Sequence, residues 1–358
     1  MQNNQALPFN KENFKQIFSK KFLFVILVSI PAALLADFFN IPLAWFLGPM
    51  IITSVVTLSG IKTQMPKLIL SSTLIILGLY IGNYIDENLF NQIHQWFWTS
   101  LIMLGYIIIS VLVVSKYLEK YSNYDKKTSI FSAAPGALGP LMILAEDEKT
   151  DLSRVATSHL IRLIIIITVF PFIVDSLYIS EEIKVSETVV KDQNSLELLI
   201  LIFVSIILIL IFDKLKIPAA LLAGTLVASG FLQITELASY QLSPNIIDFS
   251  LLILGSSVGC RFADKTFPEI AKNALHSFVA TLLLVFLGLV SAFVASLVID
   301  KNFFTLLLSY CPGGIYEVAV IAIFFDLDPE FVSFHHIIRL LLILFIVPVI
   351  LKMIQKKS

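Results

Sequence analysis

The sequence predicts an all-α polytopic membrane protein with about ten transmembrane helices and two re-entrant Pro-Gly hairpins in two inverted-topology repeats. The prediction rests on the composition, on recurring apolar runs and on an internal duplication. Apolar residues make up 57% of the chain, charged residues only 14%, and the mean hydropathy is +0.89. A soluble domain could not cover such a surface with polar groups, so a lipid bilayer is the expected surrounding.

Apolar runs of roughly spanning length lie between polar breaks throughout the chain, six in each half. In lipid only helices can use such runs, because every backbone N–H and C=O must be paired internally. The predicted segments are 22–39, 42–60, 68–85, 97–115, 129–145 and 155–178, then 196–212, 217–235, 247–260, 275–299, 303–325 and 331–351.

The second half of the chain repeats rare residues of the first half at a nearly constant offset. Gly78, Gly82, Pro135, Gly136, Asp151, His159, Arg162 and Pro171 recur as Gly255, Gly259, Pro312, Gly313, Asp328, His336, Arg339 and Pro348. Upstream, where the offset is smaller by one, Asp37, Ile41, Pro42 and Gly48 recur as Asp213, Ile217, Pro218 and Gly224. A duplication of this length indicates an architectural repeat.

We therefore expect membrane repeats at 22–178 and 196–351, joined by a hydrophilic linker at 179–195 on the outer face. Polar termini are expected at 1–21 and 352–358. The N-terminal segment leads into an apolar run that is followed closely by another, so an uncleaved first helix is expected there.

The fifth segment of each half contains helix breakers, at 132–140 and at 309–314. Proline and glycine there are compatible with a kinked span or with a hairpin that enters and leaves by one face. The distribution of lysine and arginine between the two faces decides between a hairpin and a kinked span. If both segments are hairpins, cytoplasmic segments carry 20 basic residues and outer segments 3; if both cross, the division is 16 to 7. The positive-inside rule favours hairpins and cytoplasmic termini.

The hairpin tips are the first candidate binding elements, because broken helices leave backbone groups and helix ends free to bind a solute. The alternative is a kinked helix packed among its neighbours. The candidate residues at the tips are Pro135, Gly136, Gly139, Pro312, Gly313 and Gly314.

Arg162 and Arg339 are two of only four arginines, and both fall within apolar helices. Such arginines usually face a cavity or a partner, and the guanidinium fork suits recognition of an anion or a carboxylate. Two alternatives stay open. Each arginine could extend its side chain to the headgroups, or form a structural pair with a carboxylate.

Glu317 and three histidines are the candidates for proton coupling or charge pairing. Glu317 follows the second Pro-Gly turn, and Pro140 takes its place in the first half. It could pair with an arginine structurally, or carry a proton if burial changes its titration. His159, His335 and His336 lie on the sixth segments, where they could titrate near neutral pH or pack as satisfied neutral side chains.

Other functional classes find no support in the sequence. The net charge of −1 offers no basic surface for nucleic acid, and Cys260 and Cys311 show no disulfide or metal-ligand spacing. We expect no metal, no cofactor and no enzymatic activity. The Gly78-x-x-x-Gly82 and Gly255-x-x-x-Gly259 pairs predict close helix packing.

The two sets of motifs resemble the AbrB duplication family of bacterial inner-membrane proteins, whose halves each carry a Pro-Gly-Gly turn, a nearby Glu and a His-x-x-Arg. The matching residues are Ala134-Pro135-Gly136 with His159 and Arg162, and Cys311-Pro312-Gly313-Gly314 with Glu317, His335-His336 and Arg339. The resemblance covers about Phe22 to Leu351. The sequence departs from the family pattern in its first half, where Ala137 replaces the second glycine and Pro140 replaces the glutamate. The plan of five spans and a hairpin also looks like that of glutamate:sodium and citrate-type symporters, by fold-level analogy.

The sequence therefore predicts a secondary transporter or exporter of a small anionic solute, with a proton or cation as coupling ion, in a bacterial inner membrane. Two alternatives follow from names used in the resembled family. One is a non-transporting membrane protein that regulates gene expression indirectly through partners, although the longest cytoplasmic loops, 116–128 and 261–274, are short. The remote one is a membrane monooxygenase, for which the five histidines show no copper-binding cluster.

Overall fold

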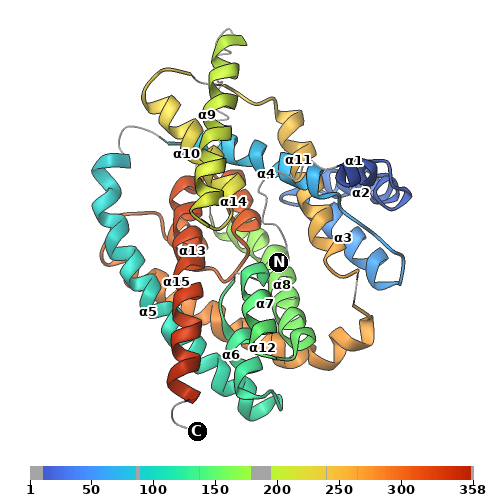
Figure 1. Ribbon diagram of the computed structural model, residues 1–358, viewed down its shortest axis with the longest axis vertical. Coiled ribbons are helices and arrows are strands. Elements are labelled where there is room, and N and C mark those ends of the chain that lie inside the picture. The colour runs from blue at the N-terminus through green and yellow to red at the C-terminus, as the bar shows by residue number, and fades with distance from the viewer. Residues whose placement is uncertain are drawn as a thin grey trace. The chain divides into compact units, whose positions relative to one another are not determined.

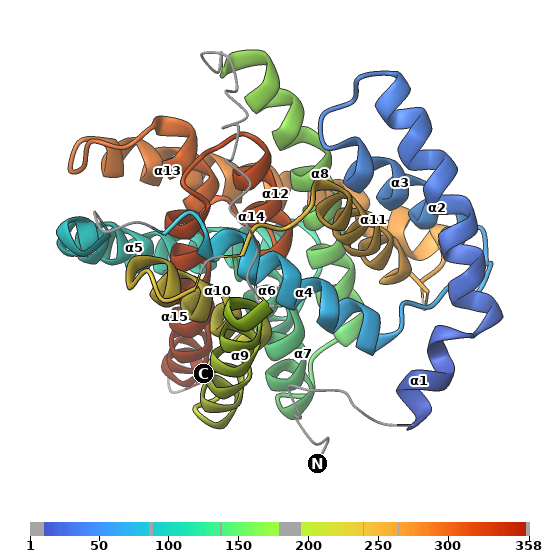
Figure 2. The same cartoon turned by 90° about the horizontal axis from the view of Figure 1, so that it is seen from above.

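The computed structural model describes residues 11–85, 89–136, 138–178, 195–238, 240–263 and 265–355, and within them the chain is helical, with no strand (Figures 1 and 2). The helices are α1 (Lys11–Ile17), α2 (Lys20–Phe38), α3 (Ala44–Leu58), α4 (Lys67–Gly82), α5 (Leu89–Tyr121), α6 (Lys126–Ala133), α7 (Leu138–Asp147), α8 (Leu152–Leu177), α9 (Ser195–Lys214), α10 (Ala220–Ile234), α11 (Pro244–Cys260), α12 (Phe267–Ser296), α13 (Phe303–Tyr310), α14 (Ile315–Phe324) and α15 (Pro329–Gln355).

These helices confirm the predicted all-α class. Ten of the predicted segments each form one helix, and each fifth segment forms two, α6 with α7 and α13 with α14. The short helix α1 lies in the N-terminal stretch expected only to be polar. Helix α5 runs past the predicted 97–115 at both ends, and its C-terminal extension contains Lys116, Glu119 and Lys120, which are good helix formers.

Among the described residues, six helices are long and apolar enough to cross a membrane, by length and composition: Lys20–Phe38, Trp96–Tyr121, Leu152–Leu177, Leu196–Lys214, Phe267–Ser296 and Pro329–Met353. Their outward faces carry large apolar side chains. In Leu196–Lys214 only 17% of the most apolar window is buried, and Leu199 and Phe203 are exposed. Lipid is the solvent that accepts such a surface, so the chain is a polytopic membrane protein.

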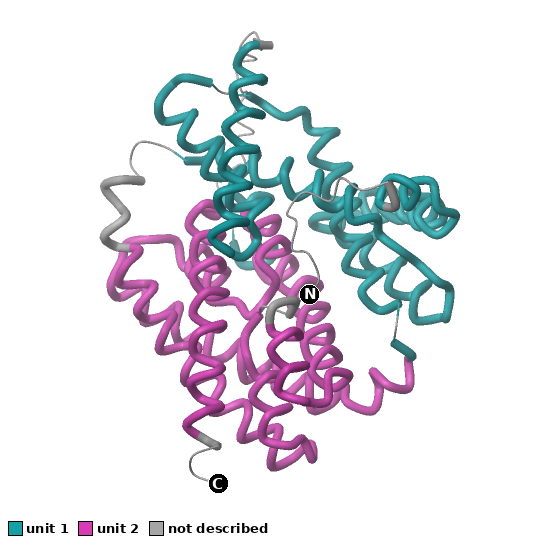
Figure 3. Tube along the Cα trace, in the orientation of Figure 1, with its two compact units in different colours: residues 1–91, 175–266, 323–326 teal, residues 92–174, 267–322, 327–358 magenta. Residues whose placement is uncertain are grey.

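The chain divides into two compact units (Figure 3). Unit 1 comprises 1–91, 175–266 and 323–326, and unit 2 comprises 92–174, 267–322 and 327–358. Each unit takes helices from both halves of the sequence. The compact units therefore differ from the sequence repeats, whose boundaries stay a prediction. The predicted linker lies almost wholly outside the described residues.

Unit 1 confirms the close packing predicted for the Gly-x-x-x-Gly pairs. A Cβ added at Gly78 on α4 would lie 2.6 Å from the carbonyl oxygen of Leu222 on α10. At Gly255 on α11, a Cβ would collide with the carbonyl oxygen of Phe46 on α3. Phe46 and Leu222 are equivalent positions of the two halves, so each glycine helix meets the same place on a helix of the other half.

Unit 2 holds α6, α7, α13, most of α14 and every residue predicted to bind solute or protons. Helices α6 and α7 lie side by side (Figures 1 and 2), α13 packs against α12 and α15, and α15 also contacts α6. Ala133 at the end of α6 belongs to a buried cluster with Val114 and Leu118 of α5 and Ala280 and Leu284 of α12. This packing holds the first break inside the unit.

Candidate functional site

Both helix breaks have the same local cause. The ring of a proline disfavours the helical conformation in the residue that precedes it. Ala134, before Pro135, accordingly has φ −61° and ψ 127°, and Cys311, before Pro312, has φ −60° and ψ 130°. Helices α6 and α13 therefore end at equivalent positions, and α7 and α14 begin just after the breaks.

Gly136 supplies the sharpest bend in the first break. Its φ is +98°, a conformation that side chains other than glycine rarely adopt. It also leaves room for a neighbour, because a Cβ at Gly136 would lie 2.8 Å from Nη2 of Arg339. The first break therefore packs against the arginine of the second half.

The two arginines bind the ends of the broken helices. Arg162 donates from Nη1 to the carbonyl oxygen of Ala134 (2.6 Å) and from Nη2 to that of Ser132 (2.5 Å). Arg339 donates from Nη2 to the carbonyl oxygen of Gly313 (2.5 Å) and from Nη1 to that of Cys311. These acceptors lie at helix ends or in the breaks, where carbonyls lack helical partners, so the guanidinium forks replace the lost hydrogen bonds.

Both arginines are buried, since Arg162 is only 2% exposed and Arg339 1%. The oxygen atoms that accept from them are neutral backbone carbonyls. Among the described residues, the Nε–H of each arginine has no hydrogen-bond partner. Both groups adjoin the first break, since Arg162 binds Ala134 and Arg339 contacts Gly136. Unit 2 thus contains two buried arginines, Arg162 and Arg339, each with an Nε–H group that can still donate a hydrogen bond.

His159 and His336 lie one turn before the arginines and bind carbonyl oxygens near the ends of the same helices, α6 and α13. Nε2 of His159 lies 3.0 Å from the carbonyl oxygen of Phe131, and Nε2 of His336 lies 3.0 Å from that of Leu308. A carbonyl only accepts, so each Nε2 carries the proton. Nδ1 of His336 then accepts from Nη2 of Arg339 at 3.1 Å. This geometry fits the satisfied neutral histidines that the sequence left as an alternative.

The remaining predicted residues have different surroundings. Glu317 is 1% exposed and its carboxylate folds over Gly314 at the start of α14, where a Cβ would lie 2.8 Å from Cδ. An acid in the first turn is favourable at a helix N-terminus. His335 points to α5, where Nε2 lies 2.7 Å from Oγ1 of Thr99. Gly139 belongs to α7, but its surroundings lie outside what the structure describes.

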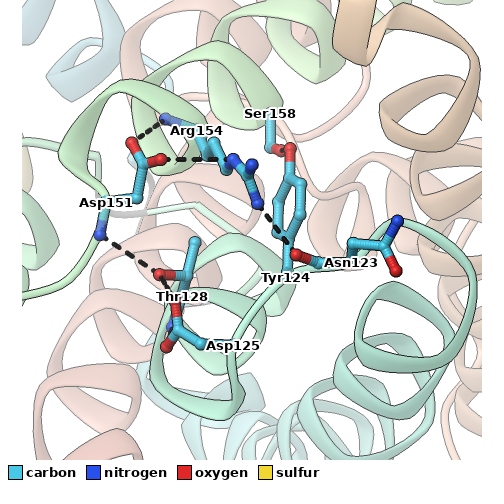
Figure 4. A network of polar contacts seen from close by, with 7 residues as sticks. All are labelled: Asn123, Tyr124, Asp125, Thr128, Asp151, Arg154 and Ser158. Atoms are coloured by element: carbon cyan, nitrogen blue, oxygen red, sulfur yellow. Dashed lines mark hydrogen bonds and ion pairs between the residues drawn. The ribbon is translucent and has the colours of Figure 1, made fainter.

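The start and the end of the first broken segment, formed by α6 and α7, are joined by a network of polar contacts (Figure 4). Asp125 caps α6 by accepting from the amide of Thr128 at 3.0 Å. The Thr128 hydroxyl donates to Asp125 and accepts from the amide of Asp151, which precedes α8, at 3.2 Å. Asp151 pairs with Arg154 at 3.1 Å. The start of α6 and the residues after α7 therefore lie together.

The second broken segment is joined at its two ends by equivalent residues, although the hydrogen bonds differ. Asn302 caps α13 by accepting from the amide of Phe304 at 2.8 Å, and the hydroxyl of Thr305 donates to Asp328 at 3.2 Å. Lys301 adds an ion pair with Asp328 at 3.0 Å. Positions 125, 128 and 151 correspond to 302, 305 and 328 at the offset that relates the two halves, so the two networks occupy equivalent places.

Sequence reasoning missed Thr128, Thr305 and the two capping residues. It noted Asp151 only as one of the repeated residues and gave Arg154 no role. The recurrence of Asp151 as Asp328 was available as a signal, and Thr128 and Thr305 are related by the same offset. Comparing every polar residue of one half with its equivalent in the other would have found them.

Within the part of the chain that the structure describes, no group of three or more His, Cys, Asp or Glu residues is placed to hold a metal ion. The chemistry that the site offers is instead electrostatic. Two fixed cations, spare N–H donors and the starts of two helices surround the breaks, and such groups favour a bound anion.

Comparisons with known proteins agree with the resemblance seen in the motifs. The family model described as "Transition state regulatory protein AbrB" matches residues 2–86 and 45–355. A Bacillus subtilis (strain 168) protein named "Uncharacterized protein YhjN" is 20% identical over 356 residues, covering 92% of this chain and 91% of that protein. An Escherichia coli (strain K12) protein named "Putative regulator AbrB" is 24% identical over 321 residues, covering 88% and 91%. No solved structure matches the chain.

Proposed function

The chain belongs to the AbrB family, and we propose that it is a secondary transporter or exporter of a small anionic solute that works by alternating access. The observation that carries the proposal is the pair of buried arginines. Their hydrogen-bond acceptors among the described residues are uncharged, namely backbone carbonyls and, for Arg339, Nδ1 of His336. A buried charge is costly unless a partner neutralises it. A bound anion between the breaks would supply that partner.

The N-termini of α7 and α14 also favour a negatively charged solute. Helices α7 and α14 begin directly after the breaks, and the N-terminus of a helix attracts negative charge. Counted as ionised, Glu317 and the two arginines leave one net positive charge among these three groups. A monoanion would balance it, and a dianion would do so together with a proton.

The joined ends of the broken segments support re-entrance. Thr128 and Asp151 are within hydrogen-bond distance, as are Thr305 and Asp328. The ends of a segment that crossed a hydrocarbon core of about 30 Å could not meet in this way. Together with the charge distribution, this favours one hairpin based on the cytoplasmic face and one on the outer face. Both termini would then be cytoplasmic.

Inverted repeats with interrupted helices are a recurrent plan of secondary transporters. In that plan the binding site lies near the middle of the bilayer and opens to each face in turn. The breaks at Pro135 and Pro312 would form the site, and Arg162 and Arg339 would counter the charge of the solute. Glu317 or a histidine would carry the coupling proton. The expected location is a bacterial inner membrane.

The proposal is tested with purified protein and a panel of small monocarboxylates, dicarboxylates, phosphate and sulfate, with neutral sugars as controls. An anion that binds the folded state raises the unfolding temperature, by mass action. The same anion is then supplied to proteoliposomes, and uptake is compared between the native chain and Arg339→Lys. Accumulation by the native chain and its loss in the variant are expected. A folded protein that neither binds nor moves any member of the panel overturns the proposal.

A second candidate function is indirect regulation of gene expression, favoured by the printed names of the family model and of the Escherichia coli relative. It requires a partner that reads the state of the membrane domain. Crosslinking in cells that recovers one dedicated regulatory protein, together with proteoliposomes that move no solute, would favour this candidate over transport.

A further inference from the structure

His335 differs from the other histidines of unit 2 in its position and its partners. Its neighbour His336 faces the second break, but His335 faces α5. Nδ1 of His335 lies 2.9 Å from the carbonyl oxygen of Phe331, and Nε2 lies 2.7 Å from Oγ1 of Thr99. The first half carries Ser158 at the equivalent position, directly before His159. A titratable group at this place therefore belongs to one half only.

Aromatic rings surround the imidazole. The ring centroids of Phe331 and Phe334 lie 4.1 and 5.4 Å from that of His335, and those of Trp96 and Tyr310 both lie at 6.4 Å. Aromatic faces attract a cation placed within about 6 Å. Burial by itself opposes a charged imidazole, and the two rings within this distance, Phe331 and Phe334, offset part of that cost.

The hydrogen bonds of His335 can accommodate either protonation state. In the neutral ring, Nδ1–H donates to Phe331, and Nε2 accepts from the hydroxyl of Thr99. In the charged ring, Nε2–H donates to that hydroxyl, which can turn to donate to the carbonyl oxygen of Trp96, 3.1 Å away. His336 lacks this freedom, because a proton on its Nδ1 would face the donating guanidinium of Arg339.

We propose that His335 is the proton-binding site that couples a proton to the anion, with Thr99 as the hydroxyl that reverses direction when the proton binds. This inference rests on the proposed function. A proton from water adds to Nε2 and forms the N–H bond. It is released by the reverse step when the site opens to the other face, so the imidazole is unchanged after each cycle.

The charged and titratable groups around His335 explain why proton and anion would bind together. Nζ of Lys301 lies 5.7 Å from the centroid of the Phe331 ring, His336 is adjacent, and Arg339 lies about one turn further along α15. On α5 and α13 the facing groups are Thr99, Trp96 and Tyr310. The cations oppose a further positive charge, so an anion that neutralises Arg339 makes protonation more favourable.

A direct contact links the proton site to the second break. The hydroxyl of Tyr310 donates to the carbonyl oxygen of Thr99 at 2.7 Å. Tyr310 is the last residue of α13 and precedes Cys311, whose carbonyl binds Arg339. Reversal of the Thr99 hydroxyl therefore takes place beside the residue that anchors the break.

Protonation can be measured without knowing the solute. The chain has three tryptophans, and replacing Trp45 and Trp98 by Phe leaves Trp96 as the only indole. A charged imidazole beside Trp96 should quench its fluorescence, so intensity should fall as pH falls, with a single midpoint. The titration should persist in His159→Gln and disappear in His335→Gln.

Thr99 provides the second measurement, which serves even if His335→Gln does not fold. Thr99→Val removes the hydroxyl that accepts a hydrogen bond from the charged imidazole of His335. The midpoint of the fluorescence titration should therefore move to lower pH by about one unit, which corresponds to a tenfold loss of proton affinity. Thr99→Ser should restore it. A folded single-tryptophan protein without a titration, or with an unchanged midpoint in Thr99→Val, overturns the inference. Because no solute is present, these results are independent of whether anion transport is found.

Discussion

Gly136 of the first break lies against the guanidinium group of Arg339, which belongs to α15, the helix that follows the second broken segment. The converse contact also exists, because a Cβ at Gly313 would lie 3.3 Å from Cγ2 of Ile166, one turn beyond Arg162 on α8. Each break therefore packs on the helix that carries the arginine of the other half. A change at one break should consequently affect both.

Gly136→Ala should destabilise the protein, because alanine is strained at φ +98° and its Cβ would press on Arg339. Strain of this kind costs about 1–3 kcal/mol. Gly105→Ala in α5 is the matched control, since nothing lies within 4 Å of a Cβ there, and alanine favours a helix interior by up to about 1 kcal/mol. Thermal unfolding in detergent measures both. Equal midpoints for the two variants would contradict the proposed contact.

Arg162→Lys and Arg339→Lys should each weaken the fold even though the charge is kept. A lysine is a point donor and cannot bridge two carbonyls as the guanidinium fork does. One buried carbonyl left unsatisfied costs about 1–3 kcal/mol. Arg261→Lys, at the less buried end of α11, is the control and should change the unfolding midpoint little. Stability equal to the native chain in both buried variants would show that the forks are dispensable.

Single cysteines at the ends of the broken segments should report their topology. In a background with Cys260 and Cys311 replaced, cysteines at Lys126 and Lys149 should react with an impermeant maleimide from the cytoplasmic face. Cysteines at Asn302 and Asp326 should react from the outer face. Labelling of Lys126 and Lys149 from opposite faces would exclude a re-entrant first hairpin.

Asp125→Asn should remove a pH-dependent contribution to stability. Burial alone raises the pKa of the Asp125 carboxyl, but hydrogen bonds from the hydroxyl and amide of Thr128 and from the amide of Lys127 outweigh it and lower the pKa. The ionised form therefore stabilises the fold. Its contribution is complete above the ordinary value of about 3.9 and is lost as pH falls through the lowered pKa.

The measurement for Asp125 is the difference in unfolding temperature between native chain and variant, followed from neutral to acidic pH. The difference should shrink on acidification. Asparagine is itself a good helix cap and occupies the equivalent position as Asn302, so the comparison isolates the charge. A difference that is constant with pH would refute the role of the carboxylate.

The sequence by itself determined the helical membrane class and the approximate position of the apolar segments. A chain this apolar lies in lipid, where a helix satisfies its backbone hydrogen bonds internally. The sequence placed the helix breaks as well, since Pro135 and Pro312 act on the residue directly before them. The sequence also predicted close packing at the Gly78-x-x-x-Gly82 and Gly255-x-x-x-Gly259 pairs, because a missing side chain is a local signal for it.

Only the tertiary structure decided what the conspicuous side chains do. Arg162 and Arg339 could have met lipid headgroups, a carboxylate or the backbone, and the fold turned both inward onto carbonyls at the breaks. His335 and His336 are neighbours in the sequence, yet packing sends one to α5 and the other to Arg339. Partners of this kind come from segments far apart along the chain, and a buried polar group takes whichever partner the packing brings within hydrogen-bond distance.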